Sequence, residues 1–308
     1  MASVYEIITN KILEALEKGV IPWINPYTGK QHQNYVSKHE YSGVNALLLN
    51  AISFIRGYTT PYWVTYRQAK EKGWNIKKGA KSAMVTFWKE YTGNSTFDSN
   101  IEETTIDENG VEEKQENKNE RKFVLRYYTI FNLDEVEGCE IPKDNNENAD
   151  FTVITNTVSI PSDYCKNQGI EVQKTLNGAS FYAPMTDSIG LAPVKPEFFV
   201  PVFAHECVHS TGHEKRLNRF GDEIFNEKAE YSFEELIAEI GSAMLCSQMG
   251  IEFSIENSAS YVSGWAEFLK EDKKTAIVRA SAKAQKAVEF ILKAAAVQQK
   301  SAEAAENV

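Results

Sequence analysis

The stretch that decides the fold of this chain is FFVPVFAHECVHSTGH, residues 198–213. It contains the pattern H-E-x-x-H, in which His205 and His209 are four residues apart. On a helix this spacing puts both imidazoles on one face, within reach of a single cation. Neutral imidazoles suit zinc, and Glu206 between them can act as general base toward a metal-bound water. The sequence therefore predicts a metal centre on this helix.

A catalytic zinc needs a third protein ligand, and the next predicted helix, from about Phe233 to Met249, offers carboxylates. Within YSFEELIAEIGSAML, residues 231–245, Glu235 and Glu239 are four apart and share a helix face. This spacing resembles the E-x-x-A-D/E pattern of zincins whose third ligand is a glutamate. By that resemblance Glu235 is the metal ligand, and Glu239 orients one of the histidines.

Two other side chains compete with Glu235 for the third position. His213 lies eight residues after His205, whereas the metzincin pattern needs its third histidine two residues later, where Lys215 stands. Glu234 is expected to point about 100° away from Glu235 on a helix. The motif could also be a coincidence on an exposed helix, but buried carboxylates without a cation would be costly. The expected cofactor is one divalent ion, zinc by default and manganese as the alternative.

The charge of the chain is uneven. The net charge is −10, yet residues 1–90 hold 12 Lys and Arg against 6 Asp and Glu. A basic N-terminal part in an acidic protein indicates an anionic partner for that part. Four of the five tryptophans also fall within residues 20–90.

Aromatic side chains beside cationic ones are typical of proteins that hold unpaired nucleic-acid strands, because bases stack on the rings while cations meet the phosphates. Core packing is the alternative explanation for each ring. The candidate single-stranded DNA contacts are Trp23, Tyr41, Asn45, Trp63, Tyr66, Arg67, Lys70, Lys77, Lys78, Lys81 and Trp88.

The rest of the composition indicates an intracellular protein with two domains. The length of 308 residues fits two domains of ordinary size. We find no signal-peptide pattern and no apolar run long enough to span a bilayer, so no membrane partner is expected. The four cysteines are scattered without a C-x-x-C pair, which fits reduced thiols and a cytoplasmic location.

The periodicity of apolar residues predicts an α+β fold with two domains, 1–141 and 151–308. Between them, residues 142–150 look like a linker, and the acidic segment 92–121 looks like a mobile, exposed insertion. The expected helices are 4–18, 43–56, about 65–73, 152–168, one containing the H-E-x-x-H motif, 233–249, 260–271 and 273–298. The expected strands are 82–91, 123–133 and a pair at about 171–175 and 179–184.

Two sets of residues resemble one family, the ArdC-type antirestriction proteins of conjugative plasmids. The first set is VIPWINPYTGKQHQNYVSKHEYSGVNALLL (20–49), GYTTPYWVTYRQAKEKGWNIKKGAKSAMVTFW (57–88) and YYTIFNLDEVEG (127–138), which is also similar to the N-terminus of TraC-type primases. The second set is DSIGLAP (187–193), FAHECVHSTGHEKRLNR (203–219) and YSFEELIAEIGSAML (231–245). The resemblance implies a single-stranded DNA-binding domain followed by a zincin-like metallopeptidase domain, and a role in protecting incoming DNA from host restriction.

Two other functions stay open at this point. The chain could be a DNA-binding protein whose metal site is structural or inactive, in which case Glu206 would be dispensable. It could also be a metallopeptidase that acts on a protein or peptide partner, with the N-terminal domain as a docking module.

Overall fold

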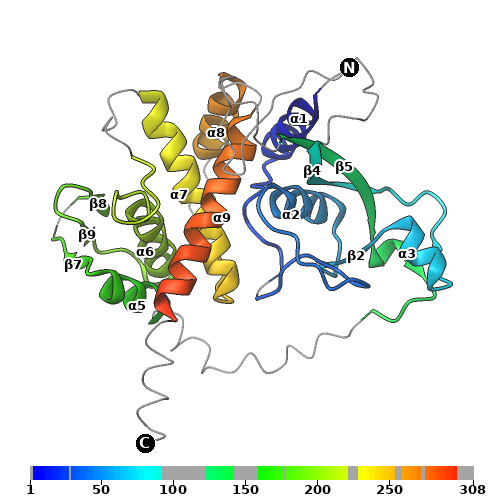
Figure 1. The fold of residues 1–308 in the computed structure, drawn as a ribbon, viewed down its shortest axis with the longest axis horizontal. Coiled ribbons are helices and arrows are strands. Elements are labelled where there is room, and N and C mark those ends of the chain that lie inside the picture. Colours follow the sequence, from blue (N-terminus) through cyan, green and yellow to red (C-terminus); the bar gives the residue numbers. More distant parts are fainter. Residues whose placement is uncertain are drawn as a thin grey trace, which may run out of the picture. The chain divides into compact units, whose positions relative to one another are not determined.

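The computed structural model describes residues 3–27, 29–91, 122–141, 159–176, 178–220, 228–253, 259–271 and 275–296. The predicted insertion 92–121 and linker 142–150 lie outside the described residues. The chain forms two compact units (Figure 1). Unit 1 contains Met1–Tyr27, Gln31–Lys143 and Asn257–Ala282, and unit 2 contains Thr28–Lys30, Asp144–Glu256 and Lys283–Val308.

Unit 1 begins with two helices whose ends follow from the local sequence. Helix α1 (Val4–Glu17) starts at a capping box, in which the Glu6 N–H donates to Ser3 Oγ and the Ser3 N–H donates to the Glu6 carboxylate. Helix α2 (Val44–Arg56) ends at Gly57, whose φ of 65° is the left-handed conformation that glycine adopts at low cost. Both helices match the sequence prediction within two residues.

The sheet of unit 1 has the order β1-β2-β5-β4, with β1 (Gln33–Asn34), β2 (Tyr62–Val64), β4 (Ala83–Tyr91) and β5 (Lys122–Asn132). The antiparallel pair β4–β5 runs from Ala83↔Ile130 to Tyr91↔Lys122, and β4 is one of the two edge strands among the described residues. The remaining small elements are α3 (Tyr66–Glu71), the 3₁₀ turn η1 (Leu133–Glu135), and the β3–β6 pair (Asn75–Ile76 with Val136–Glu137). The core on this sheet is formed by Leu49 of α2 with Trp63, Val85 and Ile130 of the strands.

Helix α8 (Ala259–Glu271) belongs to unit 1, although it lies near the C-terminus. It packs on α1 (Figure 1). Trp265 meets Trp23 edge to face at 6.1 Å between ring centroids, and Lys270 Nζ donates to Glu17 Oε1 at 2.9 Å. Compact unit 1 therefore adds residues 257–282 to the N-terminal part. The division into domains 1–141 and 151–308 stays a prediction.

Unit 2 combines helices with a three-stranded sheet. Helix α5 (Ser159–Gln168) precedes strands β7 (Glu171–Lys174), β8 (Phe181–Ala183) and β9 (Ser188–Leu191). Both predicted strands are present, but they are not neighbours, because the buried strand β9 lies between them, parallel to β7 and antiparallel to β8. Helices α6 (Pro196–Ser210) and α7 (Lys228–Gln248) follow, and the last helix of the described residues, α9 (Ala276–Ala295), belongs to unit 2 from Lys283 onward. The predicted α+β class with two domains is confirmed.

Candidate metal centre and nucleic-acid surface

Helix α6 presents the two motif histidines on one face, as their spacing requires. The rings of His205 and His209 lie 4.7 Å apart between centroids, and their Nε2 atoms are 3.0 Å apart. Two imidazole nitrogens that face each other at this distance can bind a shared cation between them.

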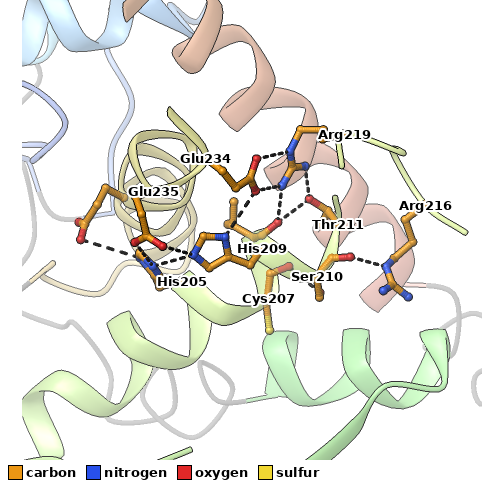
Figure 2. A network of polar contacts seen from close by, with 11 residues as sticks. His205, Cys207, His209, Ser210, Thr211, Arg216, Arg219, Glu234 and Glu235 are labelled. Carbon is orange, nitrogen blue, oxygen red and sulfur yellow. Dashed lines mark hydrogen bonds and ion pairs between the residues drawn. The ribbon is translucent and has the colours of Figure 1, made fainter. Parts of the chain in front are cut away.

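Helix α7 supplies the third group. The two Glu235 oxygens lie 3.4 Å from His205 Nε2 and 3.4 Å from His209 Nε2, and one donor atom from each of the three residues falls within 4.8 Å of the others (Figure 2). Among the described residues this is the group of acidic, histidine and cysteine side chains that could hold a metal ion. The structure thus brings His205, His209 and Glu235 together as expected.

The close packing of α6 and α7 explains why these side chains meet. A Cβ atom added at Gly241 of α7 would lie 2.9 Å from both methyl carbons of Val208 on α6, which is too close for any other residue. Glycine therefore sets how near the two helices approach. Glu235 lies less than two turns away from Gly241 on the same helix, so it reaches across to the imidazoles.

The electrostatics of the cluster fit a divalent cation. Burial by itself lowers the pKa of His209, but Glu234 and Glu235 reverse that effect and raise it to about 9. Burial likewise tends to raise the pKa of Glu235, while hydrogen bonds with His205 and His209 hold it below its ordinary value. The site therefore stabilises positive charge where the two Nε2 atoms meet. Two imidazoles and one carboxylate are also the ligand set of many catalytic zinc sites.

Glu206 lies beside strand β8. Its side chain is buried, and burial raises the pKa of its carboxyl group although His205 and His209 oppose that shift. The backbone N–H of Tyr182 in β8 donates a hydrogen bond to it. A carboxylate with a raised pKa, next to the metal ligands and an edge strand, is suited to accept a proton from water.

Two further carboxylates of α7 face the outer nitrogens of the imidazoles. Glu239 Oε1 lies 3.9 Å from His205 Nδ1, which is beyond hydrogen-bond distance, so its role in orienting this histidine stays a prediction. Glu234 Oε1 lies 3.4 Å from His209 Nδ1, a contact that the sequence did not predict. Glu234 points away from Glu235, so it does not reach the Nε2 side of the His209 ring. Its carboxylate lies on the Nδ1 side of that ring instead.

The remaining candidate of the motif region lies apart from the cluster. His213 follows α6 in the turn at its end, and its Nδ1 accepts a hydrogen bond from the Lys215 N–H at 3.2 Å. It is therefore engaged locally and is not part of the metal-binding group. Cys207, inside the motif, is buried against Cys165 with 3.7 Å between the sulfur atoms.

Three of the residues proposed to contact DNA are corrected by the structure. Trp23, Tyr41 and Trp63 are only 1%, 2% and 0% exposed, so no ring face is open to a base. Trp63 also donates its indole N–H to His32 Nδ1 at 2.9 Å. These rings form the core of unit 1. A high local content of aromatic residues did not distinguish core from surface.

Asn45 has a structural contact instead of an open amide. Its Nδ2 donates to the Thr86 carbonyl at 2.8 Å, and its Oδ1 accepts from the Thr86 N–H at 2.7 Å and from Thr86 Oγ1 at 3.0 Å. The side chain of Asn45 in α2 thus pairs with edge strand β4 as a further strand would.

The other proposed contacts lie at the surface of unit 1. Tyr66 is 62% exposed and Trp88 is 42% exposed. The exposed cationic candidates are Arg67, which pairs with Glu71, together with Lys70, Lys77, Lys78 and Lys81. Sequence reasoning did not name Tyr127 and Tyr128 of β5, which are also exposed and pair with Thr86 and Val85, just before the aromatic residues of β4. Their role in binding DNA, like that of the other surface residues, stays a prediction.

Comparisons with known proteins match both parts of the chain. Residues 2–131 match the N-terminal domain of anti-restriction factor ArdC, and residues 160–283 match a zincin-like metallopeptidase. Crystal structures of the antirestriction ArdC protein from the R388 plasmid, in metal-free and Mn(II)-bound forms, are 29% identical and have TM-scores of 0.70 and 0.71. They cover 96% of this chain, which covers 98% and 99% of theirs.

Curated relatives are longer or of similar length. Two DNA primases TraC of Escherichia coli are each 29% identical over 94% of this chain, which spans only 27% and 20% of their length. The protein y4eC of Sinorhizobium fredii is also 29% identical, and there the match covers 91% of the relative.

A histidine pair on one helix, a glutamate on the next and a mixed sheet beside them define the class of unit 2: it contains a zincin-like metallopeptidase domain. Together with the matching N-terminal domain, this places the chain in the family of ArdC-type antirestriction proteins. The resemblance seen in the sequence is confirmed. No helix in the described part of the chain has the length and apolar character needed to cross a membrane.

Proposed function

We propose that this protein binds single-stranded DNA through unit 1 and carries a metal-dependent peptidase site in unit 2, and that it protects incoming DNA from restriction in the cytoplasm. The observation that carries the proposal is the convergence of His205, His209 and Glu235, with Glu206 beside them. The antirestriction ArdC of R388 supports the biological role, since the two chains are similar over nearly their whole length.

The metal would be held by the two Nε2 atoms and the Glu235 carboxylate. A divalent ion at this position supplies a Lewis acid that makes a bound water easier to deprotonate. Zinc is the first candidate for this ligand set, and the Mn(II)-bound structure of the R388 protein makes manganese the second.

The chain's own residues would position the substrate and move the proton. Glu206 accepts a proton from water and can return it to the leaving amine. Strand β8 is an edge strand, since the sheet order is β7-β9-β8, and an extended peptide can pair with such an edge. Because the Tyr182 N–H of β8 contacts Glu206, a peptide at this edge would lie next to the base.

The exposed surface of β4 and β5 supports the DNA-binding part. Val85 pairs with Tyr128, so Phe87 and Tyr128 lie on the same face, with 5.8 Å between their ring centroids. Arg126 stands opposite Phe87 in the register. Exposed rings next to cations can stack with bases while the cations meet phosphates. Affinity for an unpaired strand should then fall steeply with salt.

Three measurements on the full chain test the proposal. Elemental analysis of wild type and His205→Ala should find one divalent ion per chain in the wild type only. Glu206→Gln should keep the metal and lose antirestriction; if antirestriction persists, the metal site is structural or inactive. A gel shift with an unpaired oligonucleotide should show binding that weakens with salt, and no shift would favour a docking module for proteins.

A further inference from the structure

A buried arginine lies behind the candidate metal centre. Arg219, in the segment that follows α6, binds Glu234 with both arms: Nε donates to Oε2 at 3.1 Å and Nη2 donates to Oε1 at 2.6 Å (Figure 2). The two side chains are 5% and 8% exposed. Such a two-armed pair fixes the plane of the carboxylate as well as its position.

Arg219 is itself attached to the end of α6. Its Nη1 donates to Thr211 Oγ1 at 2.6 Å, and its Nη2 also donates to the Val208 carbonyl at 2.9 Å. Val208 directly precedes His209 in the chain. The guanidinium therefore ties a carboxylate of α7 to the helix end that carries one of the two motif histidines.

The carboxylate held in this way meets the outer side of an imidazole. Glu234 Oε1 lies 3.4 Å from His209 Nδ1, while Glu235 lies 3.4 Å from Nε2 of the same ring. A proton on Nδ1, donated toward Glu234, leaves the Nε2 lone pair directed at the point that His205 and Glu235 share. Metal-binding histidines are commonly fixed by an acceptor at their second nitrogen.

We propose that Glu234 and Arg219 are positioning residues for the metal: Arg219 fixes Glu234, and Glu234 sets the ring orientation and tautomer of His209. The inference rests on the proposed metal site and adds two residues that do not touch the ion. A buried carboxylate needs a partner that satisfies it, and Arg219 provides one. Glu234 Oε1 accepts from Arg219 Nη2 and still lies 3.4 Å from His209 Nδ1.

A second arginine of the same segment offers a matched control. Arg216 is also buried, with a side chain 1% exposed, and its Nε donates to the Ser210 carbonyl at 2.6 Å. Its other partners are Asp187 and the Tyr182 hydroxyl of the β8–β9 region. Arg216 therefore anchors the same end of α6, but none of these partners is in contact with an imidazole of the centre.

The test compares Arg219→Gln, Glu234→Gln and Arg216→Gln in the full chain. The Zn²⁺ dissociation constant is measured by competition with a chromophoric chelator at pH 8.5, where protons compete less for the imidazole than at neutral pH, and thermal unfolding is measured in EDTA. We expect Arg219→Gln and Glu234→Gln to weaken Zn²⁺ binding about 10- to 100-fold. Arg216→Gln should lower the unfolding temperature but leave the dissociation constant unchanged.

The double variant Arg219→Gln/Glu234→Gln shows whether Arg219 acts on metal binding through Glu234 or independently of it. If Arg219 acts through Glu234, the double variant binds Zn²⁺ as weakly as Glu234→Gln alone. Where a glutamine variant does not fold, Arg219→Lys and Arg216→Lys replace the pair, and only the first should weaken binding. Equal dissociation constants for the Arg219 and Arg216 variants overturn the inference. A wild-type chain that binds no metal would instead refute the metal site.

Discussion

The titration of His209 gives the sharpest quantitative prediction for the metal-free protein. Its pKa is raised from 6.5 to about 9 because Glu234 and Glu235 stabilise the imidazolium more than burial destabilises it. A group whose pKa is raised on folding stabilises the folded state when it is protonated. This stabilisation is fully present below pH 6.5 and is lost as the pH rises through 9.

The size of the effect follows from the shift. Each pKa unit corresponds to about 1.4 kcal/mol, so the full contribution of His209 is about 3 kcal/mol. The ring is only 13% exposed, and solvent therefore screens the ion pairs weakly. Between pH 7 and pH 8.5 the free energy of unfolding should fall by about 2 kcal/mol, since the folded chain still binds a proton that the unfolded chain has released.

Urea unfolding in EDTA at several pH values from 7 to 8.5 measures this slope, with His209→Gln as the control that lacks the group. This pH range lies above the titration of His32, which is buried and whose pKa is lowered to about 3. His32 makes the free energy of unfolding rise with pH, and that rise is nearly finished at pH 7. The pH range also ends below the range in which Cys246, whose pKa burial raises to about 12, contributes most. Equal slopes for wild type and His209→Gln would refute the reasoning. Saturating Zn²⁺ should remove the decline, since the metal replaces the proton.

Three further predictions concern the two candidate sites. Glu206→Gln should bind Zn²⁺ as the wild type does and lose at least about 100-fold in peptide hydrolysis, measured on a cleaved substrate; undiminished hydrolysis would exclude Glu206 as the base. Asn45→Ala leaves buried Thr86 groups without hydrogen-bond partners and should destabilise the protein by about 2–4 kcal/mol in urea unfolding. The DNA affinity of the folded chain should not change. A large loss of affinity in a stable variant would instead support Asn45 as a DNA contact. Phe87→Ala and Tyr128→Ala should each weaken binding of an unpaired oligonucleotide by about 1–3 kcal/mol while Trp63→Phe changes stability only, and unchanged binding would exclude this face of β4–β5.

The metal cluster could be predicted from the sequence because its information is local. The four-residue spacing of His205 and His209 fixes their common face on any helix, and an acidic residue on the next helix completes a known ligand set. The contact between Glu234 and His209 depends on how α7 crosses α6. Arg219, which binds Glu234, lies outside any helix or strand, so no helical spacing in the sequence points to it. These contacts are properties of the tertiary fold.

The burial of the aromatic residues, by contrast, could not be predicted from the sequence. Trp63 and Trp88 look alike in the sequence, since each stands in a short apolar and aromatic segment near lysines. Trp63 lies in interior strand β2 and is fully buried, whereas Trp88 lies in edge strand β4 and is 42% exposed. Strand order alone does not decide which ring is covered, because Val85 of the same edge strand is fully buried; the elements that pack over each position decide it. Composition carries no information about that packing. The packing of α8 on α1 is a long-range contact of the same kind.

A single helix contact links the stability of unit 2 to the geometry of its site. Helix α7 provides Glu234 and Glu235 to opposite sides of the His209 ring, so a shift of α7 relative to α6 would move both carboxylates at once. The close approach at Gly241 and the two-armed pair of Arg219 with Glu234 limit that shift from two directions. The residues that pack the two helices together are therefore also those that set where the imidazoles and carboxylates converge. A chain that kept the H-E-x-x-H motif but lost this packing would keep the ligands without the site.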